Sequence, residues 1–197
     1  RSFVACRLAC AAVSAACAVS TSCFLAPARS TSSAAWACAT PAFAHVTLEV
    51  GEAAVGSPYK AVLRLPHGCS GNATTSVTVK LPEGFISAKP MPKAGWTLDI
   101  KKGAYGATYK LYGADVKDGA LEITWSGGNL PDDEYDEFVI RGTVAAELKP
   151  DTSIFFPVIQ KCTTGEEDWI DIPVDGQPEP DTPAPGLKLV APTGGDD

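Results

Sequence analysis

The sequence predicts an all-β protein, a single-domain β-sandwich of the immunoglobulin or fibronectin type III kind. Apolar and polar residues alternate with a period of two in many short runs after residue 45. Pairs rich in Gly, Pro and Asp separate these runs, and no window shows an apolar stripe with helical spacing over three turns. Many short strands with regularly spaced turns are typical of a β-sandwich.

The alternation predicts about nine short strands. They cover residues 45–50, 59–65, 76–81, 96–100, 121–125, 138–144, 154–159, 169–172 and 187–190. Turns are expected at 82–84, 118–119, 127–128 and 175–176. We expect the sandwich to span residues 45–174. A C-terminal extension, residues 175–197, would follow, with a stiff proline-rich connector at 178–186 and a possible edge strand at 187–190.

Residues 1–44 differ from the rest of the chain. They hold three arginines, no Asp or Glu, many Ala and Ser residues and five of the seven cysteines. The segment ends in Ala42-Phe43-Ala44, an A-x-A cleavage signal, so we interpret it as a cleaved signal or targeting segment. A transit peptide or a disordered tail is the alternative. Cleavage would make His45 the new N-terminus of a periplasmic or extracellular protein, or of one in an organelle lumen.

The charge and hydropathy of the chain exclude two classes of partner. After residue 44 the chain has 13 basic and 23 acidic residues, a balance that argues against nucleic acid. No run reaches the roughly 18 apolar residues of a membrane span. We therefore expect no nucleic-acid partner and no membrane span.

Two cysteines, Cys69 and Cys162, remain after the leader. In an oxidising compartment such an isolated pair predicts a disulfide. The alternative is a thiolate metal site, but no C-x-x-C spacing supports it. A disulfide closing so long a loop would stabilise the fold by about 4 kcal/mol on the chain-entropy model.

The chain has only two histidines, His45 and His67. If residues 45–50 and 59–65 form an antiparallel hairpin, His45 lies opposite Pro66 or its neighbours, and His67 lies beside His45. The alternative is that both are ordinary surface or core histidines. An N-terminal histidine offers its free amine and ring Nδ1 to one metal, and a second imidazole adds a third nitrogen. This nitrogen set suits Cu(II), and acidic neighbours such as Glu49 could partly offset its charge.

Other candidate residues give weaker signals. Trp169 is expected either to pack in the core or to form an aromatic wall beside the metal. The acidic run 132–137 could bind Ca²⁺, but it lacks the spacing of an EF-hand loop and is better read as a solvated loop. No nucleophile elbow, phosphate-binding loop or dinucleotide fingerprint is present in the sequence.

Several stretches of the chain resemble the YcnI-like copper-binding domain family. The resemblance covers about residues 45–174 and rests on Ala42-Phe-Ala-His-Val-Thr-Leu-Glu49, Tyr59-Lys-Ala-Val-Leu-Arg-Leu-Pro-His-Gly-Cys69, Lys89-Pro-Met-Pro-Lys-Ala-Gly-Trp-Thr-Leu98, Trp125-Ser-Gly-Gly128, Tyr135-Asp-Glu-Phe138 and Phe156-Pro-Val-Ile-Gln160. It implies an exported immunoglobulin-like domain that binds Cu(II) through the N-terminal histidine exposed by cleavage. Some members complete this brace with a Glu. Here Pro66-His67-Gly68 occupies the place of the further ligand, which implies His45 and His67 as metal ligands and Trp169 as a neighbour.

The resemblance also implies a role in copper homeostasis, with a periplasmic copper chaperone or a copper-import membrane protein as partner. We therefore expect a copper-binding protein and not an enzyme. The alternative is a copper-dependent oxidative enzyme resembling lytic polysaccharide monooxygenases, whose aromatic substrate face could be built from Tyr105, Tyr109 and Tyr112. A third possibility is an adhesion or scaffold sandwich without a metal.

Overall fold

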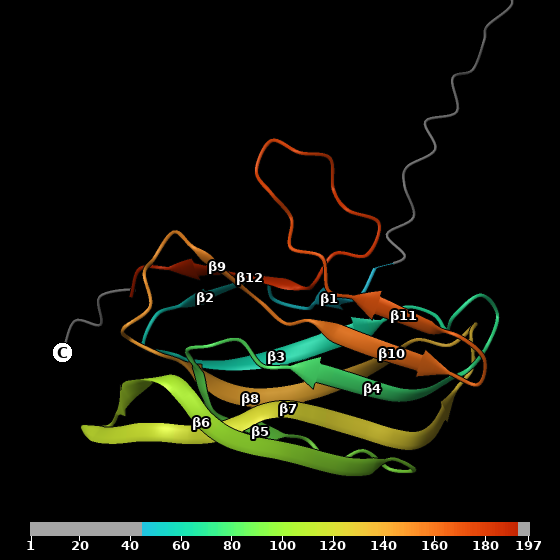
Figure 1. The fold of residues 1–197 in the computed structure, drawn as a ribbon, viewed down its shortest axis with the longest axis horizontal. Helices are drawn as coiled ribbons and strands as arrows, with labels where there is room; N and C mark the ends of the chain where they lie inside the picture. Colours follow the sequence, from blue (N-terminus) through green and yellow to red (C-terminus); the bar gives the residue numbers. More distant parts are fainter. Residues whose placement is uncertain (1–44, 193–197) are drawn as a thin grey trace, which may run out of the picture. The chain divides into compact units, whose positions relative to one another are not determined.

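A computed structural model describes residues 45–192, and the predicted leader lies outside the described part. The described residues form twelve strands and no helix (Figure 1). The strands are β1 (Thr47–Leu48), β2 (Glu52–Ala54), β3 (Pro58–Leu65), β4 (Thr74–Lys80), β5 (Phe85–Pro90), β6 (Thr97–Leu111), β7 (Ala114–Leu130), β8 (Asp136–Val144), β9 (Ser153–Phe155), β10 (Val158–Cys162), β11 (Glu166–Trp169) and β12 (Gly186–Val190). Accordingly, no helix in residues 45–192 is long and apolar enough to cross a membrane.

The strands pair in three sheets. One sheet has the order β1-β3-β8-β5, a second the order β11-β10-β4-β7-β6, and a third the order β2-β12-β9. In Figure 1 the second sheet lies across the first, and the small third sheet lies at the end where β9 and β12 are labelled. This arrangement confirms the predicted all-β sandwich.

The core lies between the inward faces of these sheets. Alternation explains which residues reach it, because successive side chains of a strand point to opposite faces. In β3, for example, Ala61, Leu63 and Leu65 are fully buried. Lys60, which lies on the opposite face of the strand, is exposed to solvent. The opposite sheet contributes Trp125 and Val79, both fully buried. These side chains form one continuous apolar cluster.

The longest hairpin differs from the prediction. β6 and β7 run almost without interruption to a turn at Tyr112 and Gly113, whose φ angles are 50° and 82°. The turns predicted at 118–119 and 127–128 lie inside β7 instead. Their glycines make room for rings: a Cβ at Gly119 would lie 1.9 Å from the Tyr105 hydroxyl oxygen, and one at Gly128 2.0 Å from the Trp96 ring. The glycines thus serve close packing and not chain reversal.

The C-terminal strand also lies elsewhere than at an edge. β12 pairs with β2 on one side, in parallel, and with β9 on the other, antiparallel. Leu187 and Leu189 point into the core and are fully buried. The core therefore extends past residue 174, where we predicted the sandwich to end, because the three-stranded sheet needs β12 at its centre.

Candidate metal centre

The two histidines are brought together by the pairing of β1 with β3. Thr47 lies opposite Arg64 and Leu48 opposite Leu63 in an antiparallel register. Continuing this register by two residues places His45 opposite Pro66, next to His67, as the assumed hairpin predicted. β2, however, leaves this hairpin and joins β12 in the third sheet.

Both histidine rings pack against one tryptophan. Trp169, the last residue of β11, is 4% exposed, and its ring centroid lies 5.7 Å from that of His45 and 6.3 Å from that of His67. The His67 and Trp169 rings meet edge to face. The structure thus joins three predicted site residues from three distant parts of the chain. Trp169 belongs both to the core and to this cluster.

Gln160 links the tryptophan to the His67 segment, and the sequence did not single it out as a site residue. It is fully buried in β10. Its side-chain oxygen accepts a hydrogen bond from Trp169 Nε1 at 3.0 Å, and its Nε2 donates to the His67 carbonyl and to Thr74 Oγ1, both at 2.8 Å. A polar residue at an inward position of an alternating strand is the signal that could have found it.

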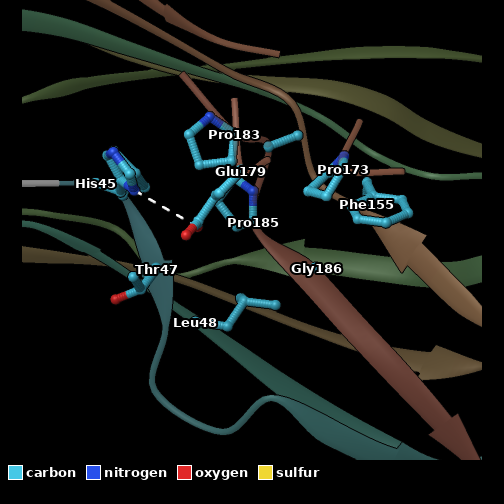
Figure 2. A pocket seen from close by; sticks show the side chains of 11 residues that line it. His45, Thr47, Leu48, Phe155, Pro173, Glu179, Pro183, Pro185 and Gly186 are labelled. Carbon is cyan, nitrogen blue, oxygen red and sulfur yellow. Dashed lines mark ion pairs between the residues drawn. The ribbon is translucent and has the colours of Figure 1, made fainter. Parts of the chain in front are cut away.

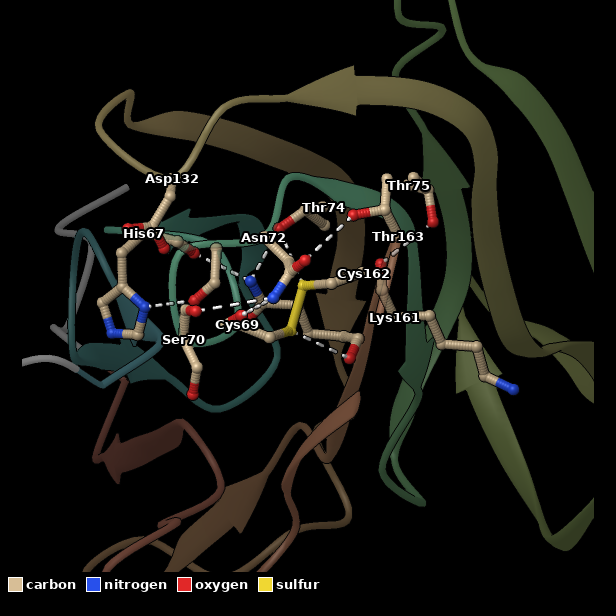
Figure 3. The surroundings of a disulfide bond; sticks show 12 residues. His67, Cys69, Ser70, Asn72, Thr74, Thr75, Asp132, Lys161, Cys162 and Thr163 are labelled. Atoms are coloured by element: carbon tan, nitrogen blue, oxygen red, sulfur yellow. Dashed lines mark hydrogen bonds between the residues drawn. A yellow bond between two sulfur atoms is a disulfide. The ribbon is translucent and has the colours of Figure 1, made fainter. Parts of the chain in front are cut away.

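The loop that carries His67 is held in several ways. The His67 Nδ1 lies 2.5 Å from the Gly68 carbonyl oxygen, and Cys69 and Asn72 exchange two backbone hydrogen bonds (Figure 3). A Cβ at Gly68 would lie 2.0 Å from the Asn72 carbonyl oxygen, so no other residue fits there. With a proton on Nδ1 donated to this carbonyl, the neutral ring carries its lone pair on Nε2.

The predicted disulfide between Cys69 and Cys162 is present, with the two Cα atoms 5.9 Å apart (Figure 3). It joins the loop after β3 to the end of β10 across a sequence separation of 93 residues. Cys69 is buried. The bond therefore fixes the segment two residues from His67 to the sheet that carries Gln160 and Trp169. It is also consistent with an oxidising, exported environment.

A carboxylate that the sequence analysis did not single out approaches His45. Glu179 lies in the long connection between β11 and β12, and its Oε1 is 3.8 Å from His45 Nδ1 (Figure 2). The two residues line a cavity of about 320 Å³ together with the prolines of this connection and Phe155. Glu49, which we expected near the metal, instead pairs with Arg64 at 3.0 Å. The β11–β12 connection therefore supplies the nearby negative charge.

Side chains alone do not complete a metal site. Within residues 45–192, no group of three or more His, Cys, Asp or Glu side chains is arranged to hold a metal ion. Two imidazoles beside one tryptophan would supply two ligands. A third nitrogen would have to come from the main-chain amine of His45, which is free only when cleavage has occurred.

The competing sites have other roles in the structure. In the acidic run, Asp136 forms an ion pair with Lys93 at 2.6 Å and Asp132 accepts a hydrogen bond from the Gly71 amide. These interactions give two carboxylates of the run a role in holding neighbouring segments.

The three tyrosines do not form a flat aromatic face. The Tyr105 and Tyr109 rings contact each other, and Tyr109 is buried with its hydroxyl donating to Glu83 at 2.6 Å. Burial, and secondly this hydrogen bond to Glu83, raises the pKa of Tyr109 to about 12. Tyr112 alone of the three is strongly exposed.

Comparison with known proteins gives a family and a fold. A family model described as a domain of unknown function, DUF1775, matches residues 45–189. An uncharacterized protein from Nocardia farcinica with an immunoglobulin-like fold is 26% identical, with a TM-score of 0.57 over 75% of this chain and 99% of that one. The sixth cohesin from scaffoldin B of Acetivibrio cellulolyticus, solved with a dockerin, is 13% identical with a TM-score of 0.39 over 74% and 97% of the two chains. No curated protein matches.

Proposed function

The chain belongs to the DUF1775 family, and on that premise we propose that its mature form is an exported Cu(II)-binding protein of copper trafficking or homeostasis. One copper ion would be held by the His45 amine, the His45 ring and the His67 ring. The observation that carries the proposal is the packing of both histidines against the buried Trp169. A partner would be a copper chaperone or a copper-import membrane protein of the same compartment.

The chemistry of the donor set supports copper. The amine and Nδ1 of one N-terminal histidine close a six-membered chelate ring, and His67 adds a nitrogen from the neighbouring loop. Nitrogen ligands in a near-planar set are those that Cu(II) prefers, and Cu(II) leads the divalent first-row ions in affinity. Met91 is exposed on the chain beyond β5, and both cysteines of residues 45–192 are in the disulfide, so soft ligands for Cu(I) are not supplied here.

The surroundings would tune this site. Three neutral nitrogens leave the charge of a divalent ion uncompensated, and the Glu179 carboxylate beside His45 is placed to offset part of it. Trp169 covers the histidine pair from the core side and would keep water from one face of the ion. Gln160 holds both the Trp169 indole and the His67 main chain, which orients the two groups that do not come from the N-terminus.

The enzyme alternative receives less support. A polysaccharide oxidase is expected to present exposed aromatic rings near its copper, whereas Tyr109 is buried and Tyr105 packs against it. We therefore propose binding and not oxidation as the function. An assay with ascorbate, oxygen and polysaccharide tests this choice, and oxidised sugars among the products would contradict it.

Cu(II) titration of protein that begins at His45 tests the copper site. We expect one Cu(II) per chain and an electron paramagnetic resonance spectrum of nitrogen ligation. A methionine before His45 converts the amine into an amide and should weaken binding most, as should His45→Ala. His67→Ala should bind with intermediate affinity because the two-nitrogen chelate persists. Equal affinity in the native and methionine-extended proteins would refute the brace.

A further inference from the structure

Three basic side chains form a row across the sheet that contains β3, β8 and β5. Lys60 of β3 lies directly opposite Arg141 of β8, and Arg141 lies directly opposite Lys89 of β5. Directly opposite residues of antiparallel strands share a face of the sheet. All three side chains are exposed. With strands about 4.8 Å apart, the row spans about 10 Å.

The row is electrostatically unfavourable by itself. Within residues 45–192, none of the three cations takes part in an ion pair, although five other Lys and Arg residues do. Like charges directly opposite each other destabilise a sheet. The arrangement stands out because acidic residues outnumber basic ones by 23 to 13 after residue 44, so carboxylates to neutralise it are abundant elsewhere on the chain.

A β-bulge brings Lys89 into the row. The register of β5 and β8 shifts between the pairs Ile86↔Thr143 and Lys89↔Arg141. Over this stretch β5 advances by three residues and β8 by two, so β5 contains one extra residue. Without the extra residue, Ala88 would lie opposite Arg141. Ser87, in the bulge, has a φ of 52°, a left-handed conformation that costs energy for a residue with a side chain. The chain thus adopts a strained bulge that places a second cation beside Arg141.

A cavity of about 240 Å³ opens at this point of the sheet. Its walls include the side chains of Lys89 and Arg141, the hydroxyl residues Ser87 and Thr143, and Tyr112 at the tip of the β6–β7 hairpin. None of the residues that line it is acidic. The cavity therefore combines two cations and two hydroxyl donors with a small apolar wall.

We propose that this cavity binds a small organic polyanion of the di- or tricarboxylate class. A planar guanidinium matches a carboxylate with two parallel hydrogen bonds, and an ammonium group adds a second point of charge. Ser87 and Thr143 can donate to further carboxylate oxygens, and the wall that contains Tyr112 covers the carbon skeleton. Lys60 extends the positive field on the other side of Arg141. The carboxylates of the bound ligand neutralise the row of cations. The carboxylates of residues 45–192 leave that role to the ligand, because none of them forms an ion pair with Lys60, Lys89 or Arg141. The site is distinct from the proposed copper centre.

Calorimetric titration of metal-free protein, residues 45–197, with citrate at low ionic strength tests the proposal. We expect saturable binding of one citrate per chain. The K89Q/R141Q double variant should bind at least about tenfold more weakly, because each lost charged hydrogen bond contributes that much or more. The K80Q/K149Q variant loses the same charge from exposed positions outside the cavity and should bind like the parent.

Thermal unfolding without ligand gives a second readout. The K89Q/R141Q variant should unfold at a higher temperature than the parent at low salt, because it relieves the repulsion in the row, and citrate should raise only the parent's unfolding temperature. The proposal is wrong if citrate binds the parent without saturation, or if it binds the K89Q/R141Q variant equally well. Inorganic phosphate should bind more weakly than citrate, because it is too small to reach both cations and both hydroxyl residues at once, and equal affinity would overturn the assignment to a carboxylate ligand.

Discussion

Gln160 shows how one buried amide can organise a site built from distant segments. Its three hydrogen bonds reach Trp169, the His67 carbonyl and Thr74, and all of its side-chain groups are thereby used in a fully buried position. Loss of one member of such a network lowers the stability of the fold, because each partner that loses its hydrogen bond stays buried and unsatisfied. We therefore regard Gln160 as the residue that holds Trp169 and the His67 loop in register.

Replacement of Gln160 should be strongly destabilising. In Gln160→Leu the Trp169 Nε1 and the His67 carbonyl lose their partner, and we expect the free energy of unfolding to fall by about 2–4 kcal/mol. Urea unfolding followed by fluorescence measures this. Gln177→Ala, at an exposed position of the β11–β12 connection, is the matched control and should change stability by less than about 0.5 kcal/mol. Equal stability of both variants would contradict the role given to Gln160.

Trp169 should report copper directly. Paramagnetic Cu(II) held by the two histidines would lie beside its ring and quench its fluorescence, so Trp169→Phe should abolish most of the quenching that copper causes in the parent. Trp96→Phe is the control, because the Trp96 ring packs against Phe138, with 5.1 Å between the ring centroids. Unchanged quenching in Trp169→Phe would place the metal elsewhere.

At the scale of elements, Tyr59 ties β3 to the segment that follows β1. Its hydroxyl donates to the Val50 carbonyl at 2.5 Å, and its side chain is 7% exposed. Burial, and secondly the negative charge of Glu49, raises the pKa of Tyr59 from 10.0 to about 12. The folded protein therefore keeps a proton that the unfolded chain loses above pH 10.

The shift in the Tyr59 pKa gives a pH prediction with a definite sign. Between pH 10 and 12 the folded state binds more protons than the unfolded state, so the free energy of unfolding should fall as the pH rises through this window. Tyr59 contributes at most about 3 kcal/mol to that fall. Tyr59→Phe should lose stability less steeply between pH 10 and 12, while Tyr109 maintains part of the slope. Denaturant unfolding at several pH values measures it, and identical slopes would refute the assignment.

Strand-level prediction from the sequence succeeded where alternation is regular. β3, β4 and β8 fall close to the predicted ranges, because apolar residues at every second position of these strands are buried. β5 was missed because its bulge breaks the alternation, and the β6–β7 hairpin was cut short because glycines that accommodate rings resemble glycines that turn the chain.

The pairing of His45 with the neighbourhood of His67 was predictable from the hairpin register. Glu179 was not, because its contact with His45 joins residues far apart in sequence through an irregular connection.

At the scale of the whole molecule, the C-terminal strand β12 contributes to the stability of the fold, although the predicted domain boundary at residue 174 leaves it out. A variant that ends at residue 174 loses Leu187 and Leu189, each worth about 1.5–3 kcal/mol of burial, and leaves β2 and β9 without their common partner. We expect this variant to be unfolded or insoluble, whereas a variant ending at residue 192 should show cooperative thermal unfolding by circular dichroism. Cooperative unfolding of the shorter variant at the same temperature would show that β12 is dispensable.

The burial of Val46 would couple the predicted cleavage after Ala44 to the docking of β1. Val46 is 1% exposed and belongs to the core, so only His45 separates the predicted cleavage point from packed structure. A peptidase must take several residues on both sides of the bond into its own cleft in extended form. Cleavage after Ala44 therefore requires that β1 has not yet docked onto β3, or that it detaches again. Creation of the amine that is proposed to bind copper would then depend on how often β1 is undocked from β3, so a variant that holds β1 more tightly should mature more slowly.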